Sequence, residues 1–194
     1  MEIAQNITGI ILSGGKSSRM GSDKASLLLN GKPFIQHVIE AVKPLVNTLF
    51  IVSSNPEHDI FDLERINDYM EDAGPLSGLY TGLAHSKTEY NLVLSCDIPF
   101  IKTETLSLLL DENFSGYDIV QLSSNSKSMP LIALYKKSCA PICLELLNSG
   151  ERRLRKAIEK FNVKTIEVDC IQAYQTHNIN TKEQLNLIIH EHQR

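Results

Sequence analysis

Short apolar runs rich in β-forming residues alternate along this chain with longer segments of helical periodicity. Six runs have the length of buried strands, at residues 7–12, 48–53, 90–95, 117–122, 131–135 and 163–168. Several are apolar on both alternations, which is typical of strands covered on both faces. This alternation predicts parallel strands joined by crossover helices. We therefore expect a three-layer α/β/α fold with a mostly parallel twisted sheet.

Apolar residues at helical spacing predict the helices between these strands. Pro33 starts the first helix, whose apolar stripe runs through residues 34–42. Other stripes follow Pro75 and Thr103, and Thr103 is a candidate N-cap. The remaining apolar positions are Leu76, Leu79, Tyr80 and Leu83, residues 105–110, Leu154, Ile158 and Phe161, and Leu185, Leu187, Ile188 and Ile189. Residues 123–130, SSNSKSMP, instead predict a flexible loop.

Length and composition indicate one globular unit. The chain has 194 residues and no Gly-, Pro- or Ser-rich linker divides it, so we expect residues 1–194 to form a single domain. The formal net charge of −4 argues against broad nucleic-acid or membrane-surface binding, because such proteins present a basic face. No apolar run approaches the roughly 18 residues of a membrane span. The N-terminus lacks the basic region of a signal peptide, and we expect a cytoplasmic protein.

The cysteines and histidines show no metal-site spacing. Only Cys139 and Cys143 are close in sequence, without a second pair or a nearby histidine. The four cysteines are therefore expected to be buried free thiols rather than zinc ligands or disulfides. Among the six histidines, only His190 and His192 approach ligand spacing. No set of serine, histidine and acid indicates a covalent nucleophile.

The stretch LSGGKSSRMGSDK, residues 12–24, follows the first predicted strand and carries three cations and one acid. In open parallel sheets, ligands bind beyond the carboxyl ends of strands, where glycines let backbone amides approach phosphates. Gly14 and Gly15 suit that role, and Arg19 and Lys24 would bind phosphate oxygens. The alternative is a glycine turn with solvated charges. The stretch matches neither a P-loop nor a dinucleotide fingerprint, so we expect a Rossmann-like N-terminal half that binds a nucleotide in a different cradle.

Asp97 stands at the end of the predicted strand at residues 90–95. Pro99 follows two residues later, so the chain must leave the sheet where the carboxylate is presented at the ligand edge. A carboxylate there suits Mg²⁺, which completes its coordination with waters and substrate phosphates. The alternative is an aspartate that caps the next helix. We expect the metal role, because a triphosphate leaving group needs its charge neutralised.

The stretch at residues 12–24 fits the pattern LxGGxSxRMGxDK, carried by Leu12, Gly14, Gly15, Ser17, Arg19, Met20, Gly21, Asp23 and Lys24. It resembles the signature of the molybdenum cofactor guanylyltransferase family, a group of nucleotidyltransferases of the nucleotide-diphospho-sugar transferase type. The double glycine favours the guanylyl members over their cytidylyl relatives. Similar blocks follow in family order: GKP at 31–33, GPLSG at 74–78, CDIPF at 96–100, PLIALY at 130–135, GERR at 150–153 and NINTKEQL at 178–185.

The resemblance implies roles for specific residues. Arg19, Lys24 and Asp97 would be catalytic, and Asp97 would hold Mg²⁺ or Mn²⁺. The nucleotide would be bound by Leu12, Ser13, Gly14, Gly15, Lys24, Asp68 and Asp97. Asp72 competes with Asp68 for that contact, and either acid could instead serve a turn or a helix entry. Ser53 stands where the family often has asparagine, which leaves the contact with base or ribose at the second strand open.

The second substrate would meet residues near the C-terminal end. The resemblance implies that Asn180, with Asn178, faces the pterin phosphate or the metal. A capping box for the last helix, completed by Glu183 or Gln184, explains one of these asparagines equally well. Arg152 and Arg153 lie in the GERR block and could meet an anionic pterin, although most basic helix faces are merely solvated.

Together these implications predict transfer of GMP from GTP to the phosphate of molybdopterin or molybdenum cofactor, with release of pyrophosphate. The product would be the guanine dinucleotide form of the cofactor. The acceptor phosphate is already an anionic nucleophile, so the protein must align and neutralise charge rather than remove a proton. Molybdenum-insertion proteins and chaperones of acceptor enzymes are the implied partners. The alternatives are a cytidylyl or sugar-phosphate nucleotidyltransferase with the same loop, and a non-catalytic nucleotide or pterin carrier.

Overall fold

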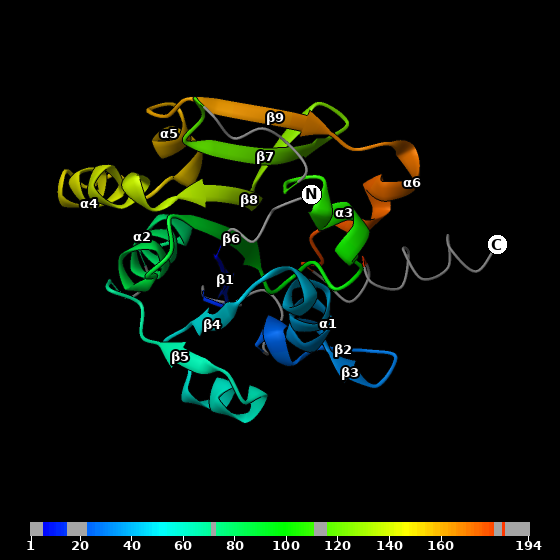
Figure 1. Cartoon of the computed structure of the whole chain (residues 1–194). Coiled ribbons are helices and arrows are strands. Elements are labelled where there is room, and N and C mark those ends of the chain that lie inside the picture. The colour runs from blue at the N-terminus through cyan, green and yellow to red at the C-terminus, as the bar shows by residue number, and fades with distance from the viewer. Residues whose placement is uncertain (1–5, 15–22, 71–72, 111–115, 181–183, 185–194) are drawn as a thin grey trace.

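The computed structural model describes residues 6–14, 23–70, 73–110, 116–180 and 184, which form a sheet flanked by helices (Figure 1). The main sheet has seven strands in the order β5-β4-β1-β6-β8-β7-β9. Their bounds are β1 Ile7–Leu12, β4 Thr48–Val52, β5 Glu64–Ile66, β6 Tyr90–Ser95, β7 Ile119–Ser124, β8 Lys127–Lys136 and β9 Val163–Glu167. Only β8 runs antiparallel to its neighbours, so the expected mostly parallel α/β fold is confirmed.

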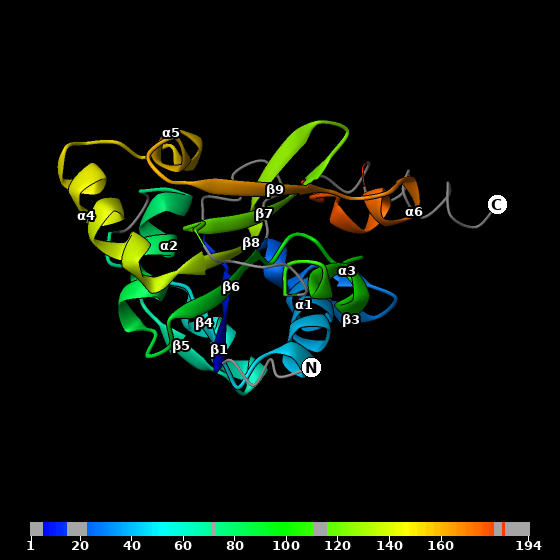
Figure 2. The same cartoon turned by 45° about the horizontal axis from the view of Figure 1, so that its top comes forward.

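Helices cover both faces of this sheet, as Figures 1 and 2 show. Helices α1 Phe34–Val42 and α3 Thr103–Ser107 pack together on one face. Helices α2 Pro75–His85, α4 Ala140–Asn148 and α5 Leu154–Ile158 cover the other. A two-stranded ribbon, β2 Leu28–Leu29 and β3 Lys32–Pro33, precedes α1, and α6 Cys170–Ala173 follows β9. These elements form the three expected layers.

Strand β1 explains why two layers of helices form. Its side chains alternate between the faces, so Ile7 and Ile11 join the core under α1, whereas Ile10 and Leu12 join the core under α2. All six β1 residues are buried. Burial of each large apolar side chain contributes roughly 1.5–3 kcal/mol. An apolar run of this kind is stable only between two covering layers.

Residues 123–130 are not the flexible loop that the sequence predicts. Strand β7 continues to Ser124, and β8 starts at Lys127, with Ser123 paired to Ser128. The turn between them uses Asn125 and Ser126, whose φ angles are 50° and 59°. Two residues with positive φ match the twist of a tight hairpin. The serine-rich composition favours a loop, but the two strands pair through backbone hydrogen bonds, which do not depend on apolar side chains.

Smaller corrections concern Thr103 and Cys170. Thr103 does not cap α3, because the N-cap is Lys102, and the Thr103 hydroxyl donates to the Ala41 carbonyl at 2.9 Å instead. Cys170 is exposed, whereas Cys96, Cys139 and Cys143 are buried, and all four thiols are free. The helix expected around residues 185–189 lies outside the described residues.

The carboxyl ends of β1, β4, β5 and β6 lie at one edge of the sheet. Backbone hydrogen bonds continue the ladder just past the strands, from the Ser13 amide to the Val52 carbonyl at 3.0 Å and from the Cys96 amide to the Leu12 carbonyl at 3.1 Å. The residues predicted to bind the nucleotide follow these strand ends. No helix in the described part of the chain is long and apolar enough to cross a membrane.

Candidate functional site

Three predicted site residues converge at the ligand edge of the sheet. Lys24 opens the 3₁₀ turn Lys24–Ser26, and its Nζ lies 3.4 Å from Asp97 Oδ2. The same ammonium donates to Asn180 Oδ1 at 2.5 Å. Lys24 is 73 residues from Asp97 and 156 residues from Asn180 along the chain. The fold therefore brings together two acceptor oxygens and one cation.

Further hydrogen bonds fix Asp97 and the segment beside it. The Ser95 hydroxyl donates to Asp97 Oδ1 at 2.6 Å, which orients the carboxylate beyond β6. The Asp97 carbonyl accepts from the Ile179 amide at 2.8 Å, which ties the C-terminal segment to this point. The Asn180 amide donates to Gln184 Oε1 at 2.8 Å, four residues further along the chain. Asn180 is thus held by its backbone while its side chain accepts from Lys24.

The acceptors around Lys24 suit a hard divalent cation. Asp97 Oδ2 and Asn180 Oδ1 approach the same ammonium, and carboxylate and amide oxygens are suitable ligands for Mg²⁺. No group of three or more His, Cys, Asp or Glu residues that could hold a metal occurs in the described ranges. An ion at Asp97 would therefore need waters and phosphate oxygens from a substrate to complete its coordination.

The predicted nucleotide loop, residues 12–24, is described only at its two ends, residues 12–14 and 23–24. Leu12 and Ser13 are buried at the end of β1, whereas Gly14 is exposed, and no atom of the described residues lies within 4 Å of the place where its Cβ would be. None of the described residues therefore blocks the approach of a ligand to the Gly14 backbone. Gly15 and Arg19 lie outside the described residues, so their roles stay predictions.

Asp68 lies just past β5 at the same edge and serves the entry of α2. Its Oδ1 accepts from the hydroxyls of Ser77 and Thr81, the latter at 3.1 Å. Asp68 Oδ2 would lie 3.8 Å from a Cβ at Gly78, and that Cβ would contact the Leu12 side chain at 3.5 Å. Asp68 therefore has the predicted role at the entry of α2. It also lies close to Leu12, another residue predicted to bind the nucleotide. Asp72 lies outside the described residues.

The two arginines of the GERR block make contacts within their own connection. Arg152 donates through its guanidinium to the Leu147 carbonyl at 2.6 Å at the end of α4. The Arg153 side chain is 71% exposed and pairs with Glu151 at 2.7 Å. Hydrogen bonds from the Arg153 guanidinium, then from its backbone amide, lower the pKa of Glu151 to about 2. The structure joins neither arginine to Lys24, and Asn178 is exposed.

Sequence reasoning missed a cluster around Asp23. Asp23 Oδ2 accepts from His58 Nε2 and from Asn55 Nδ2, the latter at 2.8 Å. Asp23 Oδ1 accepts from the Ala25 amide at 3.0 Å. Burial opposes the charged form of Asp23, but these hydrogen bonds outweigh it and lower the pKa of its carboxyl. The only sequence signal was Asp23 itself, within the motif that ends at Lys24.

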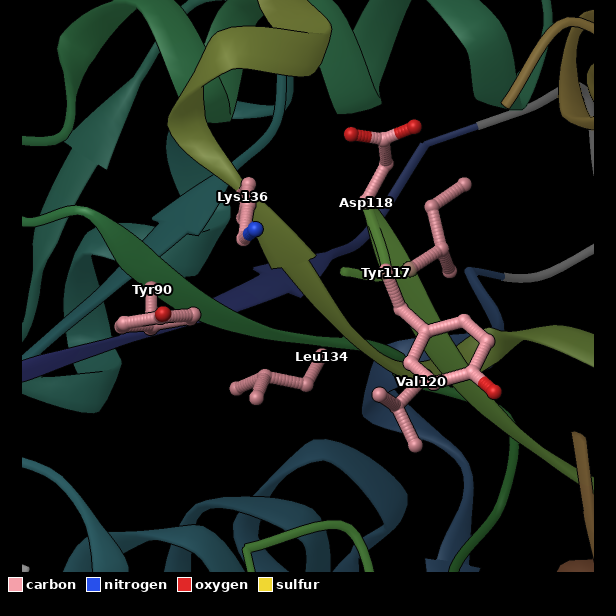
Figure 3. A pocket seen from close by; sticks show the side chains of 7 residues that line it. Tyr90, Tyr117, Asp118, Val120, Leu134 and Lys136 are labelled. Carbon is pink, nitrogen blue, oxygen red and sulfur yellow. The ribbon is translucent and has the colours of Figure 1, made fainter. Parts of the chain in front are cut away.

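Two other features are separate from this chemistry. Burial, then the charge of Asp97, raises the pKa of Cys96 to about 12, so its thiol is not poised as a nucleophile. The depression in Figure 3 is lined by Tyr90, Tyr117, Asp118 and Lys136 among others. Tyr90 begins β6, whereas Asp97 follows its far end, so this depression is not the predicted site.

The sequence matches a known family over most of its length. A family model described as "MobA-like NTP transferase domain" matches residues 9–165. The probable molybdenum cofactor guanylyltransferase of Flavobacterium johnsoniae is 38% identical over 182 residues, which cover 94% of this chain and 96% of that protein. A protein of the same name from Clostridium perfringens is also 38% identical, over 81% of this chain and 79% of its own length.

Solved structures show the same fold. Molybdopterin-guanine dinucleotide biosynthesis protein A from Archaeoglobus fulgidus aligns with a TM-score of 0.80 and 24% identity, over 96% of this chain and 98% of that one. The 4-diphosphocytidyl-2C-methyl-D-erythritol synthase of Anaerococcus prevotii aligns with a TM-score of 0.77 at 14% identity, over 98% of this chain and 97% of that one. At these identities the likeness concerns the arrangement of sheet and helices.

Proposed function

Because the chain belongs to the MobA-like NTP transferase family, we propose that it transfers GMP from GTP to the phosphate of molybdopterin or molybdenum cofactor. Pyrophosphate is released and the guanine dinucleotide of the cofactor is formed. The relatives in Flavobacterium johnsoniae and Clostridium perfringens support this choice of nucleotide and acceptor. The observation that carries the proposal is the meeting of Lys24, Asp97 and Asn180 beyond the ends of β1 and β6.

The chemistry requires alignment and charge neutralisation rather than a general base. An oxygen of the acceptor phosphate attacks the α-phosphorus of GTP, the bond from that phosphorus to the bridging oxygen breaks, and pyrophosphate leaves with the electron pair. Both reacting groups are anionic, so their repulsion is the main obstacle. Fixed positive charge at the leaving group is therefore the main contribution the protein can make.

The Lys24 ammonium supplies such a charge at a fixed position. Asp97 and Asn180 orient it, and it would bind the β- and γ-phosphates together with Arg19 and the amides of Gly14 and Gly15. Asp97, with Asn180, would hold Mg²⁺ or Mn²⁺. When bound, such an ion neutralises charge on phosphate oxygens.

The remaining predicted residues would bind the two substrates. Backbone groups of Leu12, Ser13 and Gly14 would read guanine, and Asp68 would approach the nucleoside from the end of β5. Hydrogen-bonded reading of a base discriminates strongly, because the wrong base leaves buried groups unpaired. Asn178, Asn180, Arg152 and Arg153 would face the pterin, and Arg153 is the more exposed of the two arginines. Molybdenum-insertion proteins would supply the acceptor, and chaperones of acceptor enzymes would receive the product.

The test is release of pyrophosphate from Mg-GTP with molybdopterin present, compared between the wild type and Asp97→Ala. We expect kcat to fall by about 10²–10³-fold in the variant, the range for loss of a single group that stabilises transition-state charge. The affinity for GTP, measured by calorimetry, should change much less. Glu89→Ala is the matched control, because Glu89 is an exposed acid at the opposite end of β6. Equal turnover in wild type and Asp97→Ala would refute the role of Asp97.

A further inference from the structure

Lys24 is placed by a short turn, and that turn is fixed by Asp23. The Asp23 carboxylate caps the 3₁₀ turn Lys24–Ser26 by accepting from the Ala25 amide at 3.0 Å. The Asp23 carbonyl accepts from the Ser26 amide at 3.2 Å, and Ala25 is fully buried. The orientation of Asp23 thus determines where the backbone of Lys24 lies, and hence where its ammonium can reach.

His58 and Asn55 hold the second oxygen of Asp23 from another part of the fold. Both belong to the connection after β4, where Asn55 caps the 3₁₀ turn Pro56–Phe61. Asn55 Nδ2 donates to Asp23 Oδ2 at 2.8 Å, and His58 Nε2 donates to the same oxygen. This carboxylate therefore joins the segment after β1 to the segment after β4, directly beside Lys24.

His58 is a polar side chain buried in the connection after β4. Its side chain is 1% exposed, and its ring nitrogen Nδ1 has no hydrogen-bond partner in the described part of the chain. Burying an unpaired polar atom is unfavourable by roughly 1–3 kcal/mol, so an apolar residue would pack here at lower cost. The interaction of Nε2 with Asp23 is the contact that an apolar residue could not replace.

We propose that His58 is a positioning residue for Lys24 in nucleotidyl transfer. It acts through Asp23: His58 fixes the Asp23 carboxylate relative to the connection after β4, and Asp23 in turn fixes the turn that carries Lys24. This inference rests on the proposed function, because it concerns the placement of a lysine assigned to the phosphates of GTP. Displacement of a reacting group by about 1 Å can cost up to 10²-fold in rate, so a residue without substrate contact can matter.

The test compares His58→Leu with His58→Gln. Leucine fills a similar space without a donor, whereas the glutamine Nε2 can occupy the position of the imidazole Nε2 and donate to Asp23. We expect kcat for pyrophosphate release to fall about tenfold in His58→Leu and to recover to within about threefold of wild type in His58→Gln. His85→Leu is the matched control, because it removes another histidine-carboxylate contact, to Glu64 at 3.3 Å, between the end of α2 and the start of β5.

A double-mutant cycle with Lys24→Met separates positioning from a general structural effect. If His58 acts through Lys24, His58→Leu has no further effect on kcat or on Mg-GTP affinity once Lys24 is replaced. The same fold-loss in both backgrounds, or equal loss in His58→Leu and His58→Gln, would overturn the inference. Mg-GTP affinity, measured by calorimetry, keeps the cycle informative if the wild type binds GTP but does not turn over, an outcome that refutes the proposed transfer alone.

Discussion

At the scale of single residues, hydrogen bonds from neighbouring side chains fix the orientation of the carboxylates at the site. Asp97 is oriented by Ser95, and Asp23 by His58 and Asn55. The sequence predicted Lys24, Asp97 and Asn180 because each belongs to a recognisable motif at the end of an element. It did not predict His58, because no periodicity or spacing around a single histidine in a short turn indicates contact with Asp23, 35 positions away.

Asp68 offers a test of its role at the start of α2. Replacement by alanine removes the acceptor of the fully buried Ser77 hydroxyl, whereas the Thr81 hydroxyl keeps the Ser77 carbonyl as an acceptor at 2.9 Å. We expect Asp68→Ala to lower the free energy of unfolding by about 1–3 kcal/mol, as measured by urea denaturation. The exposed Glu89→Ala should change it far less. A variant as stable as wild type would show that these hydrogen bonds contribute nothing to helix entry.

Glu151 gives the chain a defined response to acid. Its pKa is lowered to about 2 from an ordinary 4.5 by Arg153, so folding favours the charged form. The resulting stabilisation is fully present above pH 4.5 and is lost as the pH falls toward 2. We expect Glu151→Gln to be less stable than wild type at pH 7, with the difference closing below pH 4.5. Urea unfolding at several pH values measures it, and a difference that does not depend on pH would contradict the account.

At the scale of elements, the fold depends on close contact between α2 and β1. Gly82 lies against Ile10, and a Cβ at Gly82 would come within 2.6 Å of Ile10 Cγ2. The hydrophobic pattern predicted α2 and β1 correctly, since buried apolar periodicity is a property of the sequence. It could not predict β5, which has three residues, or the hairpin at residues 125–126, because both depend on backbone hydrogen bonds that the pattern of apolar side chains does not specify.

Two glycines within α2 provide a matched pair of variants. Gly82→Ala should destabilise the protein by about 1–3 kcal/mol through overpacking, despite the higher helix propensity of alanine. Gly78→Ala introduces a Cβ at ordinary contact distance, 3.5 Å from the nearest Leu12 methyl, and should be neutral or stabilising by up to about 1 kcal/mol. Thermal and urea unfolding give both values. The reverse order of stabilities would show that α2 does not pack on β1 as described.

At the scale of the whole molecule, the site exists because parallel strands deliver their following residues to one edge. Lys24 follows β1, Asp68 follows β5 and Asp97 follows β6, and the C-terminal segment returns to the same edge through the bond from Ile179 to Asp97. The alternation of strands and helices predicted this edge from the sequence. The meeting of Asn180 with Lys24 depends on the path of the chain after β9, which no local pattern fixes.

The central claim is that this edge joins GMP to a pterin phosphate. Its most direct test is incubation of the protein with Mg²⁺, molybdopterin and GTP labelled at the α-phosphorus, with labelled CTP in parallel. We predict that the label from GTP enters a pterin dinucleotide while unlabelled pyrophosphate is released, and that CTP gives little product. Transfer from CTP in preference to GTP, or GTP binding with no label in the pterin, would contradict the account.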